Sequence, residues 1–257
     1  IHYAGVCSVN ESMVNPYKYF SINTSGTNNL LRHMVMFGVR NIVFSSSCAV
    51  YGETGRVSIS ENHSTLPTDP YGQSKLMTEQ IIQWFSKLHG INYIILRYFN
   101  VCGASDDSIL GDSKKPSVHL VQNVVRGAMG LEQFFLTCPQ VSTPDGTPIR
   151  DYVNVVDLNF AHLKALKLLL KEKKNLIINI GTGNGYSVLE IVKTVQKITG
   201  SGLTINQSVG RKGEYAQMVA SSYRARSLLG WKPERSLENS VKTLMRWYSN
   251  RPNGWKS

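Results

Sequence analysis

The amino-acid sequence predicts an α/β protein in which helices flank a parallel sheet. Over the first two-thirds of the chain, short β-rich runs alternate with long helical patterns, and capping residues separate them. The chain has 257 residues, 42% of them hydrophobic, so it can bury a large core. This composition excludes a disordered chain, a collagen-like repeat and a small disulfide scaffold.

The elements of the first half follow in order from local signals. The stretch 1–4 is expected to end a strand, and Asn15 before Pro16 predicts a helix start, since Asn caps helices and Pro fits their first turn. This helix ends at Gly38, and a second ends at Gly90. Strands are expected over 41–46 and 91–97. The expected buried stripes of the two helices are Phe20, Thr27, Leu30, Leu31, Met34 and Val35, then Met77, Ile81, Trp84, Phe85 and Leu88.

After about residue 104 the pattern becomes irregular, which indicates a second lobe. We therefore divide the chain into 1–103 and 104–257, with segments near 145–180 returning to the first lobe. The elements expected in the second part are a helix near 117–129, a hairpin at Asp145–Gly146, a helix over 156–170, a strand over 176–180, a helix from Ser187 and two terminal helices.

The chain carries a formal net charge of +11, from 28 Lys and Arg against 17 Asp and Glu. Such an excess favours anionic partners: nucleic acid, an acidic membrane surface or a phosphorylated small molecule. No basic motif typical of nucleic-acid binding and no bilayer-length apolar run occurs, so neither nucleic acid nor membrane is an expected partner. The basic runs Lys114–Lys115 and 171–174 are interpreted as solvated faces.

Cysteine and histidine spacing predicts no metal site and no disulfide framework. The four cysteines form no C-x-x-C pair, and the six histidines are scattered without the spacing of a ligand pair. A reducing compartment, the cytoplasm, is therefore expected.

The sharpest local pattern is Tyr71 and Lys75, four residues apart at a helix start that follows Asp69 and Pro70. Residues at this spacing share a helix face, so the ammonium can approach the phenol. A nearby cation and the helix N-terminus favour phenolate, which predicts a Tyr71 pKa below its usual value near 10. Tyr71 would then act as a general base. The alternative is an ordinary surface pair, because this spacing often arises by chance.

Two features suggest a ligand site beside this pair. The serines 45–47 end a buried strand, at the sheet edge where ligands bind in open α/β folds, although they could equally cap the strand. Asn23 lies on the apolar face of the first helix. An unpaired buried amide costs about 1–3 kcal/mol, so Asn23 should bond either neighbouring backbone or a ligand.

The loop from Gly181 to Gly185 resembles a phosphate loop, but its spacing is G-x-G-x-G instead of the dinucleotide fingerprint. The expected acid about 20 residues later is also missing, since 199–206 contain no Asp or Glu. We interpret the loop as a tight turn, with Ser187 as the cap of the next helix.

A collinear set of motifs runs from Ile1 almost to the C-terminus. They are I-H-Y-A-G (1–5), N-T-S-G-T (23–27), F-S-S-S-C-A-V-Y-G (44–52), P-Y-G-Q-S-K (70–75), L-R-Y-F-N-V-C-G-A (96–104), D-G-T-P-I-R-D-Y-V-N-V-V-D-L (145–158), N-I-G-T-G (179–183) and R-K-G-E (211–214). Each is common, but the set in this order is highly specific. Together they resemble the extended short-chain dehydrogenase/reductase family, and within it the UDP-glucose 4-epimerases.

The resemblance implies a Rossmann-like sheet and a smaller mixed α/β lobe that binds the nucleotide-sugar. The family begins with a Gly-rich βαβ region, of which roughly 80 residues would precede Ile1. The sheet is therefore expected to be N-terminally truncated. We expect the chain to be a fragment that binds NAD poorly.

The resemblance also implies the site residues. The catalytic triad would be Ser47, Tyr71 and Lys75. NAD would be lined by Tyr3, Ala4, Gly5, Asn23, Ser45, Tyr71, Lys75 and Tyr98. The UDP-sugar would be held by Ser47, Tyr71, Phe99, Asn100, His119, Arg150, Arg211 and Glu214. The two arginines would bind its diphosphate, because planar guanidinium donors match phosphate oxygens.

The implied reaction is NAD-dependent epimerisation at C4 of a UDP-hexose, UDP-glucose or UDP-galactose, through a 4-keto sugar. Tyr71 would remove the proton of the 4-hydroxyl as hydride leaves C4 for NAD⁺. Ser47 would bond the same oxygen, and Lys75 would grip the nicotinamide ribose. The keto sugar would then turn and receive hydride on its other face, so NAD stays bound.

The sequence departs from the family pattern at several of these positions. Cys7 stands where many epimerases have a Lys near the cofactor, His119 replaces an Asn and Glu214 an Asp. Thr137 occupies a position that is often aromatic, and Met218 one associated with the acceptance of N-acetylated sugars.

Several alternative functions were weighed against epimerisation. Sugar dehydratases carry an Asp–Glu pair after the catalytic hydroxyl, whereas Cys48 and Ala49 cannot move that proton, so dehydration is disfavoured. A uronate epimerase, a decarboxylase, an inactive nucleotide-sugar-binding relative and an RNA-binding member of the fold stay open. The resemblance also implies a homodimer, through a two-helix face of 16–37 with 70–89.

Overall fold

The computed structural model describes residues 1–55, 58–114, 117–207 and 215–255. Among these, the main sheet consists of three parallel strands in the order β1-β2-β6: β1 (Asn41–Ser47), β2 (Asn92–Tyr98) and β6 (Leu176–Ile180). The sheet confirms the predicted strands to within one residue, and β6 comes from the segment that we expected to return to the first lobe.

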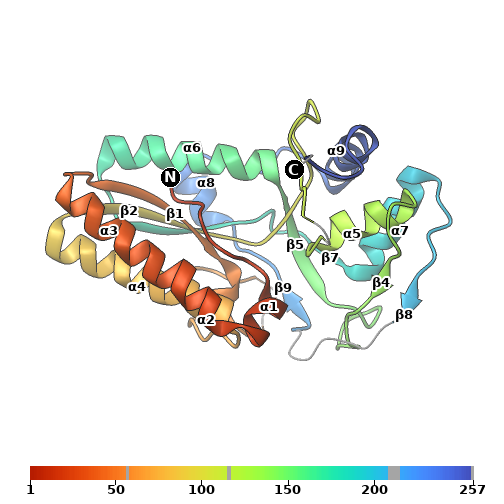
Figure 1. Ribbon diagram of the computed structural model, residues 1–257, viewed down its shortest axis with the longest axis horizontal. Coiled ribbons are helices and arrows are strands. Elements are labelled where there is room, and N and C mark those ends of the chain that lie inside the picture. Colours follow the sequence, from red (N-terminus) through yellow and green to blue (C-terminus); the bar gives the residue numbers. More distant parts are fainter. Residues whose placement is uncertain (56–57, 115–116, 208–214, 256–257) are drawn as a thin grey trace.

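Helices cover both faces of this sheet (Figure 1). On one face lie α3 (Gly26–Met36) and α4 (Pro70–His89), and on the other lie α6 (Val155–Glu172) and α8 (Tyr223–Leu229). The α/β class with a parallel sheet between helices is thereby confirmed.

Alternating strand residues form the two cores, because successive side chains point to opposite faces. Val43, Ile94 and Leu96 pack with the α6 and α8 side chains, whereas Phe44 and Ile95 pack with those of α3 and α4. The same alternation continues into the serines at the end of β1, which places their hydroxyls on both sides of the sheet edge.

The N-terminal region is more broken than its pattern predicted. His2 forms a single parallel bridge with Phe44, so the expected strand end at 1–4 is one bridged residue. Three segments then precede α3: α1 (Val9–Val14), α2 (Pro16–Tyr19) and the π-helix η1 (Phe20–Ser25). As predicted, Asn15 caps the start at Pro16, accepting from Lys18 N at 3.2 Å. Neither α1 nor the π-helix was predicted.

The second half packs around its own core. Helices α5 (Leu120–Ala128), α7 (Val188–Thr199) and α9 (Leu237–Asn250) meet there, with Trp247 fully buried. Strand β5 (Ile149–Asn154) pairs with β3 (Asn100–Cys102), with β7 (Gly185–Ser187) and with β9 (Gln217–Met218). A further parallel pair joins β4 (Phe135–Leu136) to β8 (Asn206–Gln207).

The stripe predicted as the buried face of α4 is partly wrong. Trp84 and Leu88 are 58% and 66% exposed. The face turned to the sheet instead carries Tyr71, Ser74, Lys75, Thr78, Glu79 and Ile82, all buried. The reason is that polar side chains of α4 find partners on the sheet, so apolar periodicity alone does not identify its inner face. Leu30 of α3 is similarly 38% exposed.

The hairpin predicted at Asp145–Gly146 is also wrong. A turn is present, with Gly146 O accepting from Val141 N at 2.9 Å. However, β5 after the turn pairs with β3, β7 and β9 and not with the segment before it. Across the described residues, we find no helix long and apolar enough to cross a membrane.

Candidate active site

Ser47 and Tyr71 meet because two pieces of main chain are in close contact. Ser47 ends β1 and caps the 3₁₀ helix η2 (Cys48–Tyr51), accepting from Ala49 N at 3.2 Å. The next helix, α4, starts against η2: a Cβ on Gly72 would lie 2.6 Å from Ala49 O. This contact brings the Tyr71 phenol close to Ser47, whose side chain lowers the pKa of the phenol. Asp69 caps α4 as predicted, accepting from Gly72 N at 2.8 Å.

The predicted direction of the Tyr71 pKa is wrong in this structure. Burial raises the pKa of Tyr71 well above 10, Tyr98 raises it further, and the hydrogen bond to Ser47 lowers it. A phenolate taken out of water loses its hydration, which disfavours ionisation. Because Tyr71 is only 7% and Lys75 only 5% exposed, the alternative of an ordinary surface pair is excluded.

Lys75 is held beneath the sheet edge. Its Nζ donates to the carbonyl oxygen of Ser45 at 2.9 Å and lies 5.0 Å from the centroid of the Phe44 ring. Burial lowers the pKa of Lys75 to about 8. An ammonium has three donor hydrogens, so a donor to the Ser45 carbonyl can still serve a ligand.

Asn23 is bonded within the protein, in line with the backbone alternative. Its Nδ2 donates to Val6 O and to Ser74 Oγ, both at 3.0 Å, and its Oδ1 accepts from Val6 N at 2.9 Å. The amide thereby ties the N-terminal segment to α4. Gly5 is part of this contact, since a Cβ there would lie 2.8 Å from Asn23 Oδ1 and 3.5 Å from Lys75 Nζ.

Tyr98 and Ser45 form the next part of the site. Tyr98 ends β2 directly beside Ser47 in the register, and the nearby Ser45 side chain acts to lower the pKa of its hydroxyl. Burial raises the pKa of Tyr98 to about 12. Ser45 Oγ also lies 2.9 Å from Nε2 of His162, and the exposed Tyr3 ring packs on that histidine at 4.6 Å between centroids. Ala4 lies in the same exposed stretch.

The residues predicted to hold the UDP-sugar are more dispersed. Phe99 is buried in a cluster with Cys48 and other apolar side chains, and Asn100 begins β3. The Arg150 guanidinium donates through Nη1 to Ile149 O at 2.9 Å and to Tyr215 O at 2.8 Å. The Arg150 charge also acts on Cys48, the residue after Ser47. Burial raises the pKa of the Cys48 thiol, and Arg150 lowers it.

His119 occupies the N-cap position of α5, without a side-chain capping bond. Burial lowers the pKa of His119, and the nearby charges of Asp112 and Lys114 act on it in opposite directions. The two remaining predicted residues, Arg211 and Glu214, lie outside the described residues.

The loop Gly181–Gly185 is a turn, as interpreted. The Asp151 carboxylate accepts from Thr182 N at 2.8 Å and from Gly183 N at 2.9 Å, so these amides are bound within the protein. Ser187 caps α7 in a reciprocal capping box with Glu190.

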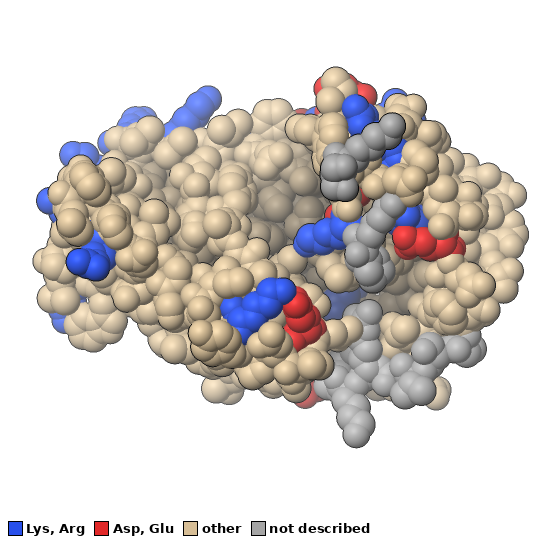
Figure 2. Space-filling model, viewed as in Figure 1, with Lys and Arg blue, Asp and Glu red and all other residues tan. Residues whose placement is uncertain are grey.

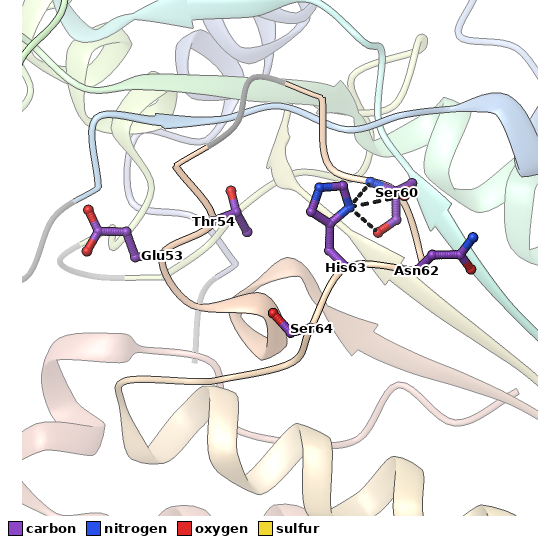
Figure 3. A pocket seen from close by; sticks show the side chains of 6 residues that line it. All are labelled: Glu53, Thr54, Ser60, Asn62, His63 and Ser64. Atoms are coloured by element: carbon purple, nitrogen blue, oxygen red, sulfur yellow. Dashed lines mark hydrogen bonds between the residues drawn. The ribbon is translucent and has the colours of Figure 1, made fainter.

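A separate polar pocket of about 520 Å³ lies beside the loop that follows η2 (Figure 3). It is lined by Glu53, Thr54, Ser60, Asn62, His63 and Ser64. Figure 3 shows the His63 ring turned toward Ser60, whose backbone N and hydroxyl both lie 3.0 Å from His63 Nδ1. Of the predicted site residues that the structure describes, none lines this pocket.

Sequence reasoning missed the residues that contact Tyr71 and the serines of β1 and hold them in place. Tyr19 packs edge-on against the Tyr71 ring at 6.2 Å between centroids. Glu79 accepts from the Ser46 hydroxyl and forms a buried ion pair with Arg97. Along with His162, these residues are far from their partners in sequence, and no local pattern marked them. Glu79 shares the helix face of Lys75, at the same four-residue spacing, and that was the available signal.

Comparison with protein families matches residues 1–181 to the NAD dependent epimerase/dehydratase family. The chain is 40% identical over 257 residues to the UDP-glucose 4-epimerase of Lacticaseibacillus casei, covering 99% of this chain and 78% of that protein. It is also 40% identical over 264 residues to the UDP-glucose 4-epimerase of Bacillus subtilis, covering 100% and 77%.

Solved structures agree. A crystal structure of a UDP-glucose 4-epimerase superimposes with a TM-score of 0.94 at 37% identity, covering 100% of this chain and 78% of that one. The enzyme from Bifidobacterium longum, crystallised with NAD⁺ and UDP, gives a TM-score of 0.93 at 35% identity, with 99% and 77% covered.

Proposed function

Because the chain belongs to the NAD dependent epimerase/dehydratase family, we infer that it is an NAD-dependent isomerase that epimerises a UDP-hexose at C4, interconverting UDP-glucose and UDP-galactose. One observation carries the inference at the level of the site: a buried Tyr71 phenol beside Ser47, whose side chain lowers the pKa of the phenol, at the carboxyl end of a parallel sheet. Ligands bind at this edge in open α/β folds.

The donor set beside this pair fits a nicotinamide ribose. The Lys75 ammonium and the Tyr98 hydroxyl converge on Ser45, and the absence of a side chain at Gly5 lets main chain approach within contact of Lys75. We propose that Tyr3, Ala4, Gly5, Ser45, Lys75 and Tyr98 line NAD, and that Asn23 acts by holding the N-terminal segment in place. When bound, NAD supplies the acceptor and donor of the C4 hydride.

Tyr71 is proposed to take the proton of the sugar 4-hydroxyl and to return it. To accept a proton the phenol must first be ionised, and burial opposes this. The Lys75 ammonium, one helical turn away, is placed to favour the ionised phenol and so to offset that cost. Ser47 would hydrogen-bond the same sugar oxygen, which fixes its distance from the phenol.

The second half of the chain is proposed to hold the UDP-sugar. Arg150 and Arg211 would bind the diphosphate, while Phe99, Asn100, His119 and Glu214 would contact the sugar or the nucleoside. On this proposal residues 1–103 form the main part of the NAD-binding lobe. Residues 104–257 form the nucleotide-sugar lobe, apart from segments near 145–180 that include β6 of the main sheet.

The test is conversion of UDP-galactose to UDP-glucose by the purified chain with added NAD, followed by proton NMR in D₂O. The proposal expects UDP-glucose with hydrogen retained at C4, since hydride is stored during the reaction and not exchanged with water. Deuterium at C4 would point to a proton-abstraction mechanism instead. UDP binding in calorimetry without turnover would point to a nucleotide-sugar-binding relative.

We also propose a homodimer formed by the outer faces of α3 and α4. These helices lie side by side in Figure 1 and expose apolar side chains away from the sheet. They are Ile22 of η1, Leu30 and Met36 of α3, Phe37 directly after it, and Trp84 and Leu88 of α4. Apolar surface gathered on adjacent helices is typical of an interaction site, and identical patches suit a two-fold dimer.

Replacing Trp84 and Leu88 together by Glu should convert the dimer to a monomer in sedimentation equilibrium. Two carboxylates per subunit would face each other in a dry interface. The matched control is the double replacement of Leu163 and Leu170 by Glu on α6, which are 48% and 58% exposed on the other side of the sheet. A monomeric parent, or equal dissociation of both variants, would refute this interface.

The cytoplasm is the proposed location. Cys7, Cys48 and Cys102 are free thiols, and two of them, Cys48 and Cys102, are buried. A reducing compartment suits such a set.

A further inference from the structure

Lys114 reaches from the second half of the chain to the N-terminal segment. Its Nζ lies 3.0 Å from Sγ of Cys7, which is 107 residues away in the sequence, and both residues are exposed. The contact bridges the two halves of the protein. The basic pair to which Lys114 belongs is interpreted above as a solvated face. Lys114 is indeed exposed, but it also contacts Cys7.

The position of Cys7 shows where this ammonium lies. Cys7 lies between Val6, whose N donates to Asn23 Oδ1 at 2.9 Å, and Ser8, whose N donates to the Tyr19 hydroxyl at 3.0 Å. The Tyr19 ring packs against Tyr71, so this segment passes beside the Tyr71 site. Lys114 also acts on the pKa of His119, which it lowers. The Lys114 ammonium therefore lies where the N-terminal segment passes beside the Tyr71 site.

The loop that carries Lys114 is anchored to α9. The Asp112 carboxylate accepts from Lys114 N at 3.0 Å and from Ser117 Oγ at 3.1 Å, and Asp112 O accepts from Trp247 Nε1 at 3.1 Å. Gly111 lies directly on the same indole, since a Cβ there would be 2.5 Å from the ring. The backbone of Lys114 is thereby fixed, while its side chain reaches across to Cys7.

Cys7 is a poor partner for this cation. A thiol is a weak hydrogen-bond acceptor, and an exposed ammonium gains little from it compared with water. Phosphate oxygens are far better acceptors for an ammonium, and such charge-assisted bonds are about twice as strong as neutral ones. Figure 2 shows Lys and Arg side chains around the hollow between the two halves, with Asp and Glu side chains beside them.

We propose that Lys114 is a diphosphate-binding residue of the active site, which exchanges Cys7 for a phosphate oxygen when ligand enters. This inference rests on the proposed function. The diphosphate can come from the nucleotide-sugar or from the dinucleotide, and both present the same chemistry to an ammonium.

Replacing Lys114 by Met should raise the Kd of either UDP or NAD about tenfold in titration calorimetry, as expected for the loss of one charge-assisted bond. A change for UDP alone identifies the nucleotide-sugar as the ligand, and a change for NAD alone identifies the dinucleotide. The control is Lys164→Met, an exposed lysine of α6 that changes the net charge equally. Its Kd values should match those of the parent.

A second variant separates loss of charge from disturbance of the loop. Adding Cys7→Lys to Lys114→Met returns an ammonium to the place where residues 7 and 114 meet, now carried by the N-terminal segment. This double variant should regain most of the lost affinity. Unchanged affinities in Lys114→Met, or no recovery in the double variant, would overturn the proposal. If the parent binds UDP and NAD and epimerises while Lys114→Met matches it, only this inference fails. If the parent binds neither ligand, the proposed function fails and this inference fails with it.

Discussion

Replacing Tyr71 by Phe should lower kcat for epimerisation by about 10²–10⁴-fold, the usual contribution of a positioned acid–base group. The substitution removes only the hydroxyl beside Ser47 and keeps the ring that packs against Tyr19. UDP affinity and the unfolding midpoint should therefore stay close to those of the parent. Initial rates with UDP-galactose, combined with UDP titration, make the measurement.

Tyr19→Phe is the matched control, because it deletes a hydroxyl from the neighbouring ring. That hydroxyl accepts from Ser8 N at 3.0 Å and donates to Glu11 at 2.8 Å, so its loss weakens the N-terminal segment. We expect about 1 kcal/mol of lost stability with kcat largely retained. Equal losses of kcat in the two variants would remove Tyr71 from its proposed role.

Replacing Glu79 by Gln should cost about 3–5 kcal/mol of unfolding free energy, because it leaves Arg97 as an unpaired buried charge. The carboxylate accepts from Arg97 Nε at 3.0 Å and from Arg97 Nη2 at 2.5 Å. The two side chains are only 1% and 5% exposed. Glu79 also accepts from Ser46, which lies between Ser45 and Ser47 at the site, so kcat should fall as well. Urea unfolding monitored by circular dichroism measures the change.

The exposed pair of Glu172 and Lys174 provides the comparison for this experiment. Its N–O distance is 2.7 Å, yet both side chains are accessible to water, so Glu172→Gln should leave the unfolding midpoint unchanged. Replacing Glu79 and Arg97 together by Met should cost less than Glu79→Gln alone, since no charge is then left unpaired. A Glu79→Gln variant as stable as Glu172→Gln would show that the buried pair does not support the sheet edge.

Local signals predicted the elements that position the site better than they predicted the environment of its side chains. The start of α4 was predicted because Asp69 and Pro70 act within a few residues, and β1 because its apolar run is continuous. The Tyr71 pKa was predicted in the wrong direction because burial depends on which elements cover the phenol. Similarly, Trp84 and Leu88 follow a helical period, but the period does not say which face meets the sheet.

The contacts that were missed link residues far apart in sequence. Ser45 and His162 are separated by 117 residues, and Lys114 and Cys7 by 107. The sequence around each of these residues does not indicate its partner, because the contact exists only once the sheet and the second lobe are assembled. The buried Asn23 is an intermediate case: its position required a bond, but only the fold shows that the partners are Val6 and Ser74.

The close approach of Gly72 to Ala49 has a consequence for how the enzyme can diversify. The distance between the Tyr71 phenol and the Ser47 hydroxyl is set by two peptide backbones in contact, and not by the bulk of surrounding side chains. Substitutions in the proposed sugar site can therefore change which carbohydrate is accepted without changing the distance between Tyr71 and Ser47. Any side chain at position 72 would change that distance directly.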